Sequence, residues 1–131
     1  MTCAPIRALV VDDDAVWRRI ICHTLEKHKV ICVQVECLED ATAELIASRF
    51  DLVLLDYELP DGEGLELLDR FDRCHLRRVV LITGYADRSD LHDDRALAVD
   101  GYLTKPFLSS DLVAFLDGIE PVGCEPLLEA K

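Results

Sequence analysis

The chain has 131 residues, half of them hydrophobic and only 6% aromatic, which suits one domain with a largely aliphatic core. Asp and Glu number 26 against 14 Lys and Arg, for a net charge of -12, and this disfavours direct nucleic-acid binding because phosphate backbones repel an acidic surface. No apolar run approaches the roughly 20 residues that span a bilayer, and no charged-then-apolar leader follows Met1, so we expect a cytoplasmic protein without membrane association.

Five short apolar runs alternate with stretches of helical periodicity. The runs cover 6–11, 30–35, 52–55, 79–82 and 101–104. Helices are predicted over 14–28, from 39 or 40 through 47, over 65–71 and 89–99, and from 109 or 110 through 116. Strands joined by helical crossovers pair in parallel, with helices on both faces. The sequence therefore predicts an α/β fold.

The helix and turn signals support this order of elements. Asp14 is a predicted N-cap for the first helix, which carries apolar residues at helical spacing, namely Val16, Ile20, Ile21 and Leu25. A turn is expected at Pro60-Asp61-Gly62. Residues 119–131 are expected to form an irregular tail, too short for a second domain.

The six cysteines contain no C-x-x-C pair and no zinc spacing. In a cytoplasmic protein we expect reduced thiols. Cys22 and Cys32 are interpreted as small core residues, and the sequence offers no positive support for a redox role.

Polar residues follow the first, third, fourth and fifth predicted strands. Asp12 and Asp13 follow the first, Asp56 the third, Thr83 the fourth and Lys105 the fifth. The carboxyl ends of parallel strands meet at one edge, where ligands bind. Three carboxylates there need a counter-ion, and Mg²⁺ prefers such oxygen ligands. A carboxylate can attack phosphorus, and an ammonium and a hydroxyl can stabilise the charge of the transferred phosphoryl group.

Four segments at these strand ends resemble the motifs of response-regulator receiver domains of two-component signalling: 9–14, 54–64, 81–84 and 101–107. The likeness covers residues 5–118, nearly the whole chain. It implies a flavodoxin-like, doubly wound (βα)5 sandwich whose five-stranded parallel sheet has the strand order 2-1-3-4-5. Each motif alone is weak evidence, whereas four in order are strong evidence.

The resemblance also implies residue roles at the acidic end of the site. Asp56 is similar to the phospho-acceptor. Asp12 and Asp13 are similar to the acidic pair that holds Mg²⁺, with Asp13 as the direct ligand, and the backbone carbonyl of Glu58 would complete the protein ligands. The alternative reading of residues 12–14 is a helix-capping acidic cluster, a role that suits Asp14.

Further roles fall on the last two strands. Thr83 is similar to the switch hydroxyl that moves onto the phosphoryl oxygens, and Lys105 to the lysine that pairs with phosphate. The peptide bond from Lys105 to Pro106 is often cis in this family. Tyr102 is similar to the aromatic residue that swings inward when the threonine moves. Taken one at a time, each residue also has a purely structural interpretation. Thr83 could be a hydroxyl bonded within a turn, Lys105 a solvated surface charge, and Tyr102 a packing residue.

The implied function is a phospho-switched binding module that catalyses only its own phosphorylation and dephosphorylation. A histidine kinase or histidine phosphotransfer protein would donate the phosphoryl group. A downstream protein would read the face of the fourth helix, fifth strand and fifth helix, with the chain a monomer or weak homodimer.

Three alternatives stay open. The chain is either a stand-alone protein or a receiver excised from a larger regulator or hybrid kinase. A Mg²⁺-dependent phosphohydrolase is less favoured, because Glu58 stands where such enzymes usually place a second aspartate. A dinucleotide binder is weaker still, because Leu67 stands where G-x-G-x-x-G needs its third glycine.

Overall fold

The computed structural model describes residues 5–72, 76–84 and 94–119. The described elements, in chain order, are β1 (Arg7–Val11), α1 (Ala15–Glu26), β2 (Ile31–Val35), α2 (Leu38–Ala47), β3 (Leu52–Asp56), β4 (Glu58–Leu59), β5 (Gly62–Glu63), the 3-10 turn η1 (Gly64–Glu66), α3 (Leu67–Arg70), β6 (Val79–Thr83), the 3-10 turn η3 (Asp94–Ala98), β7 (Gly101–Thr104), α4 (Ser109–Val113) and the 3-10 turn η4 (Ala114–Leu116).

The main sheet has five parallel strands in the order β2-β1-β3-β6-β7. This confirms the predicted order 2-1-3-4-5, because β6 and β7 are the fourth and fifth strands of the sheet. The register sets Val11 opposite Leu55, so the residues that follow β1 and the end of β3 are neighbours. The short β4 and β5 form a separate antiparallel pair.

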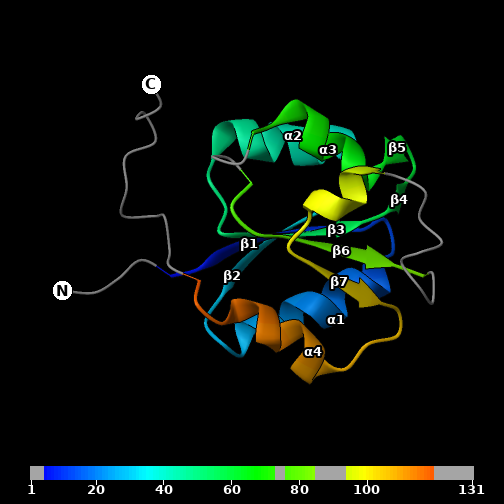
Figure 1. The fold of residues 1–131 in the computed structure, drawn as a ribbon. Helices are drawn as coiled ribbons and strands as arrows, with labels where there is room; N and C mark the ends of the chain where they lie inside the picture. Colours follow the sequence, from blue (N-terminus) through cyan, green and yellow to red (C-terminus); the bar gives the residue numbers. More distant parts are fainter. Residues whose placement is uncertain (1–4, 73–75, 85–93, 120–131) are drawn as a thin grey trace.

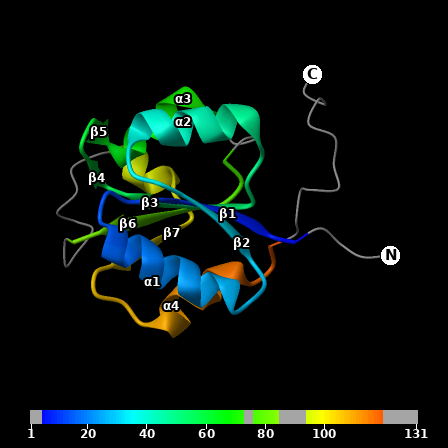
Figure 2. The ribbon, with the colours of Figure 1, turned by 180° about the vertical axis from the view of Figure 1, so that it is seen from behind.

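Helices cover both faces of the sheet (Figure 1). One face packs against α2 and α3, and the other packs against α1 and α4, as the reverse view also shows (Figure 2). Every residue of β3 and β6 is buried, as expected for central strands covered on both sides. The core is aliphatic apart from Phe50, consistent with the low aromatic content.

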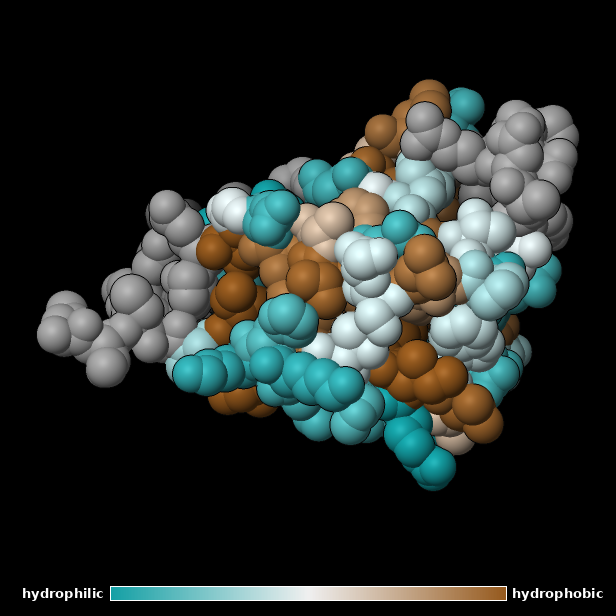
Figure 3. Space-filling model, turned by 90° about the horizontal axis from the view of Figure 1, so that it is seen from below, coloured by the Kyte–Doolittle hydropathy of each residue, from teal (hydrophilic) through white to brown (hydrophobic). Residues whose placement is uncertain are grey.

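The first helix confirms its predicted cap but not all of its predicted core. The Asp14 carboxylate accepts hydrogen bonds from the amides of Val16 and Trp17. The side chains of Val16 and Ile20 are 62% and 44% exposed. The buried face instead carries Ile21, Cys22, Thr24 and Leu25. Figure 3 shows hydrophobic side chains at the surface on the side of the molecule formed by α1 and α4.

The second helix begins at Leu38, one or two residues before the predicted start. Cys37 is its N-cap residue. The Asp61 carboxylate, from the β4–β5 turn, accepts hydrogen bonds from the amides of Leu38 and Glu39 at 2.8 and 3.0 Å. These amide bonds lower the pKa of Asp61. The sequence had predicted a turn here, and a distant carboxylate in that turn supplies the extra cap.

The remaining helices are shorter than predicted. The third divides into η1 and α3, and the fifth into α4 and η4, with Leu108 rather than a serine as its N-cap residue. The predicted helix over 89–99 is described only from residue 94, where η3 is a 3-10 turn. Most of the predicted tail, residues 120–131, lies outside the described residues. Within the described ranges, no helix has the length and apolar character needed to cross a membrane.

Candidate functional site

Three aspartates converge at the carboxyl edge of the sheet. Asp12 follows β1, Asp56 ends β3, and one carboxylate oxygen from each of Asp12, Asp13 and Asp56 lies within 4.8 Å of the others. Asp12 is fully buried, Asp56 is 8% exposed, and Asp13 is exposed. The predicted acidic cluster is therefore present, with its two buried members supplied by adjacent strands.

Backbone amides orient the two buried carboxylates. Asp12 Oδ1 accepts a hydrogen bond from the amide of Asp14 at 2.9 Å, and Asp56 Oδ1 accepts one from the amide of Glu58 at 3.3 Å. The Arg18 guanidinium donates to the Asp12 carbonyl oxygen at 2.7 Å. Each carboxylate thus uses one oxygen locally and leaves the other for the site.

Lys105 lies between those remaining oxygens. Its Nζ atom is 2.9 Å from Asp12 Oδ2 and 3.6 Å from Asp56 Oδ2. Burial alone would lower the pKa of Lys105, but its interactions with Asp12 and Asp56 outweigh burial and raise this pKa above the ordinary value. Lys105 is therefore held as an ammonium beside the acidic pair, as the resemblance implied.

One ammonium does not neutralise this cluster. Burial, followed by the charge of Asp12, raises the pKa of Asp56 to about 7, although Lys105 acts in the opposite direction. Asp12 Oδ2 is buried, and its partner is the Lys105 ammonium 2.9 Å away. Three carboxylates beside one ammonium leave an excess of negative charge, which a divalent cation bound by oxygen ligands would offset. The donor set therefore fits a metal ion.

Open space adjoins Asp56. One hollow of about 180 Å³ is lined by Asp56, Tyr57, Glu58, Thr83 and Gly84. A second, of about 350 Å³, is bounded by Asp13, Asp56, Glu58, Leu59, Pro60, Gly84 and Lys105. Asp56 lines both hollows, so a small ligand can reach its carboxylate from solvent.

Thr83 is the last residue of β6, is 2% exposed, and lines the smaller hollow with Asp56. Glu58 is exposed and lines both hollows. Its backbone amide donates a hydrogen bond to the Asp56 carboxylate, whereas the role of its carbonyl as a metal ligand stays a prediction. The structure thus gathers the predicted acidic, ammonium and hydroxyl groups at one edge.

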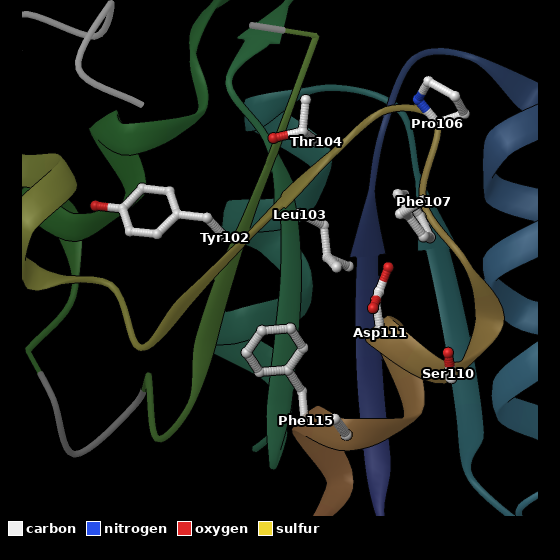
Figure 4. Close-up of a pocket in the computed structure, with 9 residues that line it drawn as sticks. Tyr102, Leu103, Thr104, Pro106, Phe107, Ser110, Asp111 and Phe115 are labelled. Carbon is white, nitrogen blue, oxygen red and sulfur yellow. The ribbon is translucent and has the colours of Figure 1, made fainter. Parts of the chain in front are cut away.

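Tyr102 lies apart from this cluster. Its hydroxyl donates a hydrogen bond to the carbonyl of Ala96 in η3, and its ring packs with a small cluster that includes Leu65 and Leu81. Figure 4 shows Tyr102 pointing toward η3, away from Phe107 and Phe115. In this conformation Tyr102 therefore contacts η3 and not the carboxylates.

Two contacts at the site were not predicted from the sequence. Trp17 lies under Lys105, whose Nζ atom is 5.5 Å from the ring centroid, and it packs against Phe107 with ring centroids 4.9 Å apart. A cation close to an aromatic face is stabilised by the ring quadrupole. The peptide bond between Lys105 and Pro106 is cis, which confirms what the resemblance implied. A single tryptophan in the first helix gave no sequence signal of this contact.

The second such contact is the close approach of Gly64 to the backbone of Asp56. A Cβ atom at this position would lie 2.0 Å from the carbonyl oxygen of Asp56, and the Gly64 amide donates to the Tyr57 carbonyl at 2.7 Å. Only glycine allows this approach without displacing the backbone. A glycine eight residues after a strand-ending aspartate was the available signal, and only tertiary packing reveals its role.

Known proteins share this architecture. The family model "Response regulator receiver domain" matches residues 8–117. The phosphate regulon transcriptional regulatory protein PhoB of Escherichia coli is 32% identical over 95% of this chain, which spans 58% of PhoB. The chain therefore covers little more than half of that curated relative.

Solved structures give the same result. A response regulator receiver domain protein (CheY-like) from Methanospirillum hungatei superposes with a TM-score of 0.76 at 27% identity, covering 86% of this chain and 91% of that one. A response regulator protein from Burkholderia pseudomallei, solved with a phosphorylated aspartic acid, calcium ion and citrate, gives a TM-score of 0.74 at 25% identity, covering 86% and 67%. From the sheet order, the polar carboxyl edge and these matches, the chain belongs to the response regulator receiver domain family.

Proposed function

We propose that Asp56 accepts a phosphoryl group from a histidine kinase or histidine phosphotransfer protein, in a reaction that requires Mg²⁺. The observation that carries the proposal is a buried carboxylate that lines two open hollows and lies beside both an acidic pair and an ammonium group. An aspartate that attacks phosphorus needs a bound cation, a positive charge and a hydrogen-bond donor for the phosphoryl oxygens. The neighbours of Asp56 can supply all three.

The proposed step is a displacement at phosphorus. A carboxylate oxygen of Asp56 forms a bond to phosphorus while the bond from phosphorus to the donor imidazole nitrogen breaks, and that nitrogen keeps the electron pair. Lys105, already 3.6 Å from Asp56, pairs with a phosphoryl oxygen, and the Thr83 hydroxyl donates to another. Both interactions oppose the negative charge of the transferred group.

Asp12, Asp13, Asp56 and the Glu58 carbonyl are the proposed ligands of Mg²⁺. When bound, the ion supplies positive charge to the carboxylates and to the phosphoryl oxygens. The raised pKa of Asp56 reflects burial and the charge of Asp12. A cation beside these groups favours the ionised, nucleophilic form of Asp56. The phosphorylated aspartic acid and calcium ion named for the B. pseudomallei protein support both assignments.

The proposed output is a change on the β7–α4 side of the molecule. A groove of about 400 Å³ lies there, lined by Tyr102, Leu103, Thr104, Pro106, Phe107, Ser110, Asp111, Ala114 and Phe115 (Figure 4). Movement of Thr83 toward the phosphoryl group would free space for Tyr102 to turn inward, which breaks its bond to Ala96 and alters both η3 and this groove. A downstream protein then distinguishes the two states, as in other phosphorylation switches.

In this proposal the chain is a cytoplasmic signalling module, a monomer or weak homodimer, without direct nucleic-acid binding. It catalyses its own phosphorylation and dephosphorylation but turns over no other substrate. PhoB, a transcriptional regulatory protein, is longer than this chain, so a receiver within a larger regulator is equally compatible. A phosphohydrolase is the weaker candidate, because Glu58 is exposed and its position holds no second aspartate.

Incubation with acetyl phosphate and Mg²⁺ tests the proposal. We expect one phosphoryl group per chain, seen as a single mass shift, and no labelling of Asp56→Asn. Sustained hydrolysis of a generic phosphate ester by the wild-type chain, without stoichiometric labelling, would support the phosphohydrolase instead.

A further inference from the structure

Three atoms of Asp12 are held by separate parts of the fold. Its backbone amide donates to the carbonyl of Val35, the last residue of β2, at 3.2 Å. Its Oδ1 atom accepts a hydrogen bond from the amide of Asp14, and its backbone carbonyl accepts one from the Arg18 guanidinium at 2.7 Å. The first two interactions use backbone donors and acceptors near the strand end, whereas the third needs one particular side chain. Arg18 is therefore a direct link from α1 to the backbone of the acidic site.

The place of Arg18 in α1 explains how its side chain reaches Asp12. The backbone amide of Arg18 donates to the carbonyl of the N-cap residue Asp14 at 3.0 Å, so Arg18 lies one turn into the helix. Helical side chains point back toward the amino end of their helix, which directs the guanidinium toward the segment that enters α1. Helix α1 lies against β1 and β2 (Figure 2). The Arg18 Nε atom also donates to Gln34 Oε1 on β2 at 3.4 Å, so the guanidinium bridges Asp12 and the edge strand.

The contact with Arg18 also fixes the start of Asp13. The Asp12 carbonyl and the Asp13 amide belong to one planar peptide unit, so a hydrogen bond to that carbonyl limits rotation of the whole unit. Asp13 is exposed, yet one of its carboxylate oxygens lies within 4.8 Å of oxygens from Asp12 and Asp56. An exposed side chain retains rotamer freedom, and a fixed backbone reduces the ways in which it can leave the cluster. A fixed peptide unit thus favours the arrangement in which both aspartates face one ligand.

We propose that Arg18 is a positioning residue for the metal site, because its hydrogen bond to the Asp12 carbonyl holds Asp12 and Asp13 in the orientation that binds a divalent cation. The inference rests on the proposed function, in which these aspartates are ligands of Mg²⁺. Arg18 donates to the backbone of Asp12 in this role, which leaves the carboxylate oxygens for the ion. Loss of a group that orients a metal ligand lowers metal affinity by roughly 10- to 100-fold.

The charge of Arg18 allows the proposal to be tested by the sign of one effect. A guanidinium near a cation site repels the ion, so removal of the charge alone should tighten Mg²⁺ binding. Removal of the hydrogen bond should instead weaken Mg²⁺ binding, because Asp12 and Asp13 lose their fixed orientation. The proposal requires that the second effect exceed the first.

The test is a titration of the full chain with MgCl₂, without a phosphoryl donor, followed by Trp17 fluorescence and by isothermal titration calorimetry. We expect the midpoint of Arg18→Ala to rise about 10-fold. The matched control is Arg19→Ala, which removes the same charge from an exposed neighbour on the same helix and should leave the midpoint at or slightly below the wild-type value. Asp51→Asn, which alters a buried hydrogen bond at the opposite end of the sheet, controls for a general loss of stability and should keep the wild-type midpoint.

A lysine variant carries the test if Arg18→Ala does not fold. Lysine keeps the charge but cannot bridge Asp12 and Gln34 with a planar fork, so Arg18→Lys should raise the midpoint about 3-fold and Arg19→Lys should not. The inference is overturned if the Arg18 variants bind Mg²⁺ as tightly as the wild type or more tightly, or if the Arg19 variants lose as much affinity. The wild type still binds Mg²⁺ in those cases, and the proposed function stands. Absence of any Mg²⁺ response in the wild type would overturn the metal site itself, and this inference with it.

Discussion

Buried aspartates lie at both ends of β3. The carboxylate at one end is hydrogen-bonded to a neighbouring strand, whereas the carboxylate at the other end faces further carboxylates. Asp51 precedes the strand and is 1% exposed; its carboxylate accepts the amide of Arg7 at 2.9 Å, and its own amide donates to the Arg7 carbonyl at 2.8 Å. Asp56 ends the strand and is 8% exposed; it accepts one amide at 3.3 Å and faces Asp12. Burial is similar, but the surroundings differ.

The difference distinguishes carboxylates that hold the backbone from those at the proposed phosphorylation site. At the amino end, the charged groups hold the backbone. The Asp51 carboxylate accepts a hydrogen bond from the amide of Arg7, and the Asp100 carboxylate accepts one from the amide of Val79 at 2.7 Å. The Arg78 guanidinium donates to backbone carbonyls at the end of the last helix. At the carboxyl end, three carboxylates crowd around one ammonium. Crowding of like charges, rather than burial, therefore distinguishes the end of the sheet at which we propose phosphorylation.

The largest expected effect is that of metal removal, which acts only at the carboxyl end. Chelation by EDTA should lower the rate of labelling by acetyl phosphate by about 100-fold or more, since loss of preorganised positive charge at a phosphoryl group costs several kcal/mol. Added Mg²⁺ should restore the rate. A rate that EDTA leaves unchanged would contradict the metal assignment.

A milder form of the same test uses Trp17, the single tryptophan, which lies beside Lys105. Its fluorescence should change on Mg²⁺ titration, with a midpoint raised about 10-fold in Asp13→Asn because a carboxylate ligand is lost. Asp94→Asn, at an exposed aspartate of η3, should leave the midpoint unchanged. Equal midpoints in all three proteins would exclude Asp13 as a ligand.

Lys105→Ala should slow labelling by roughly 10- to 100-fold, the cost of losing one positioned charge at a phosphoryl oxygen. Exposed Lys27, at the end of α1, offers the matched control, and Lys27→Ala should label at the wild-type rate. The check is the initial rate with acetyl phosphate at fixed Mg²⁺. If both variants match the wild type, Lys105 does not pair with the phosphoryl group.

The two ends of β3 should respond with opposite signs when a carboxylate becomes an amide. Asp51→Asn should lower the free energy of unfolding by about 1 kcal/mol, because a charge-assisted hydrogen bond is replaced by a neutral one. Asp56→Asn should raise it by about 1 kcal/mol above pH 7 without metal, because a repelled buried charge is removed. Urea unfolding measures both, and loss of stability in Asp56→Asn would contradict this electrostatic account.

The smallest effect belongs to Asp61, an exposed aspartate whose carboxylate caps α2 from the β4–β5 turn. Its pKa is lowered in the folded protein by the amides of Leu38 and Glu39. Its contribution is therefore present above the unfolded pKa of about 4 and is lost as pH falls through the lowered value. Asp61→Ala should cost about 0.5 kcal/mol near neutral pH and nothing in acid. A pH-independent difference in urea unfolding would argue against the cap.

The parallel sheet and the position of the acidic cluster were predictable because both follow from local pattern, whereas the strand order was implied by the family resemblance. Apolar runs separated by helices imply a parallel sheet, and a residue that ends a strand lies at the sheet edge whatever surrounds it. Asp12, Asp56 and Lys105 all lie at that edge for this reason. Contacts between distant segments left no comparable pattern, so the Asp61 cap and the close approach of Gly64 to Asp56 were not predicted.

Periodicity also overstated the buried face of α1. Val16 and Ile20 have helical spacing but are exposed, because the helix buries the face that carries Ile21, Cys22, Thr24 and Leu25 instead. The short η1 and α3 show the same limit, since the spacing of Leu65, Leu67 and Leu68 does not distinguish a 3-10 turn from an α-helix. Tertiary packing decides such cases.

The most direct test of the central claim is to locate the phosphoryl group on the chain. Labelled protein is reduced with borohydride, which converts a phosphorylated aspartate into a distinguishable residue, and then digested and sequenced by mass spectrometry. We predict conversion at Asp56 in the wild type and in Asp51→Asn, and none in Asp56→Asn. Conversion at another aspartate, or full labelling of Asp56→Asn, would contradict the assignment of Asp56 as the acceptor.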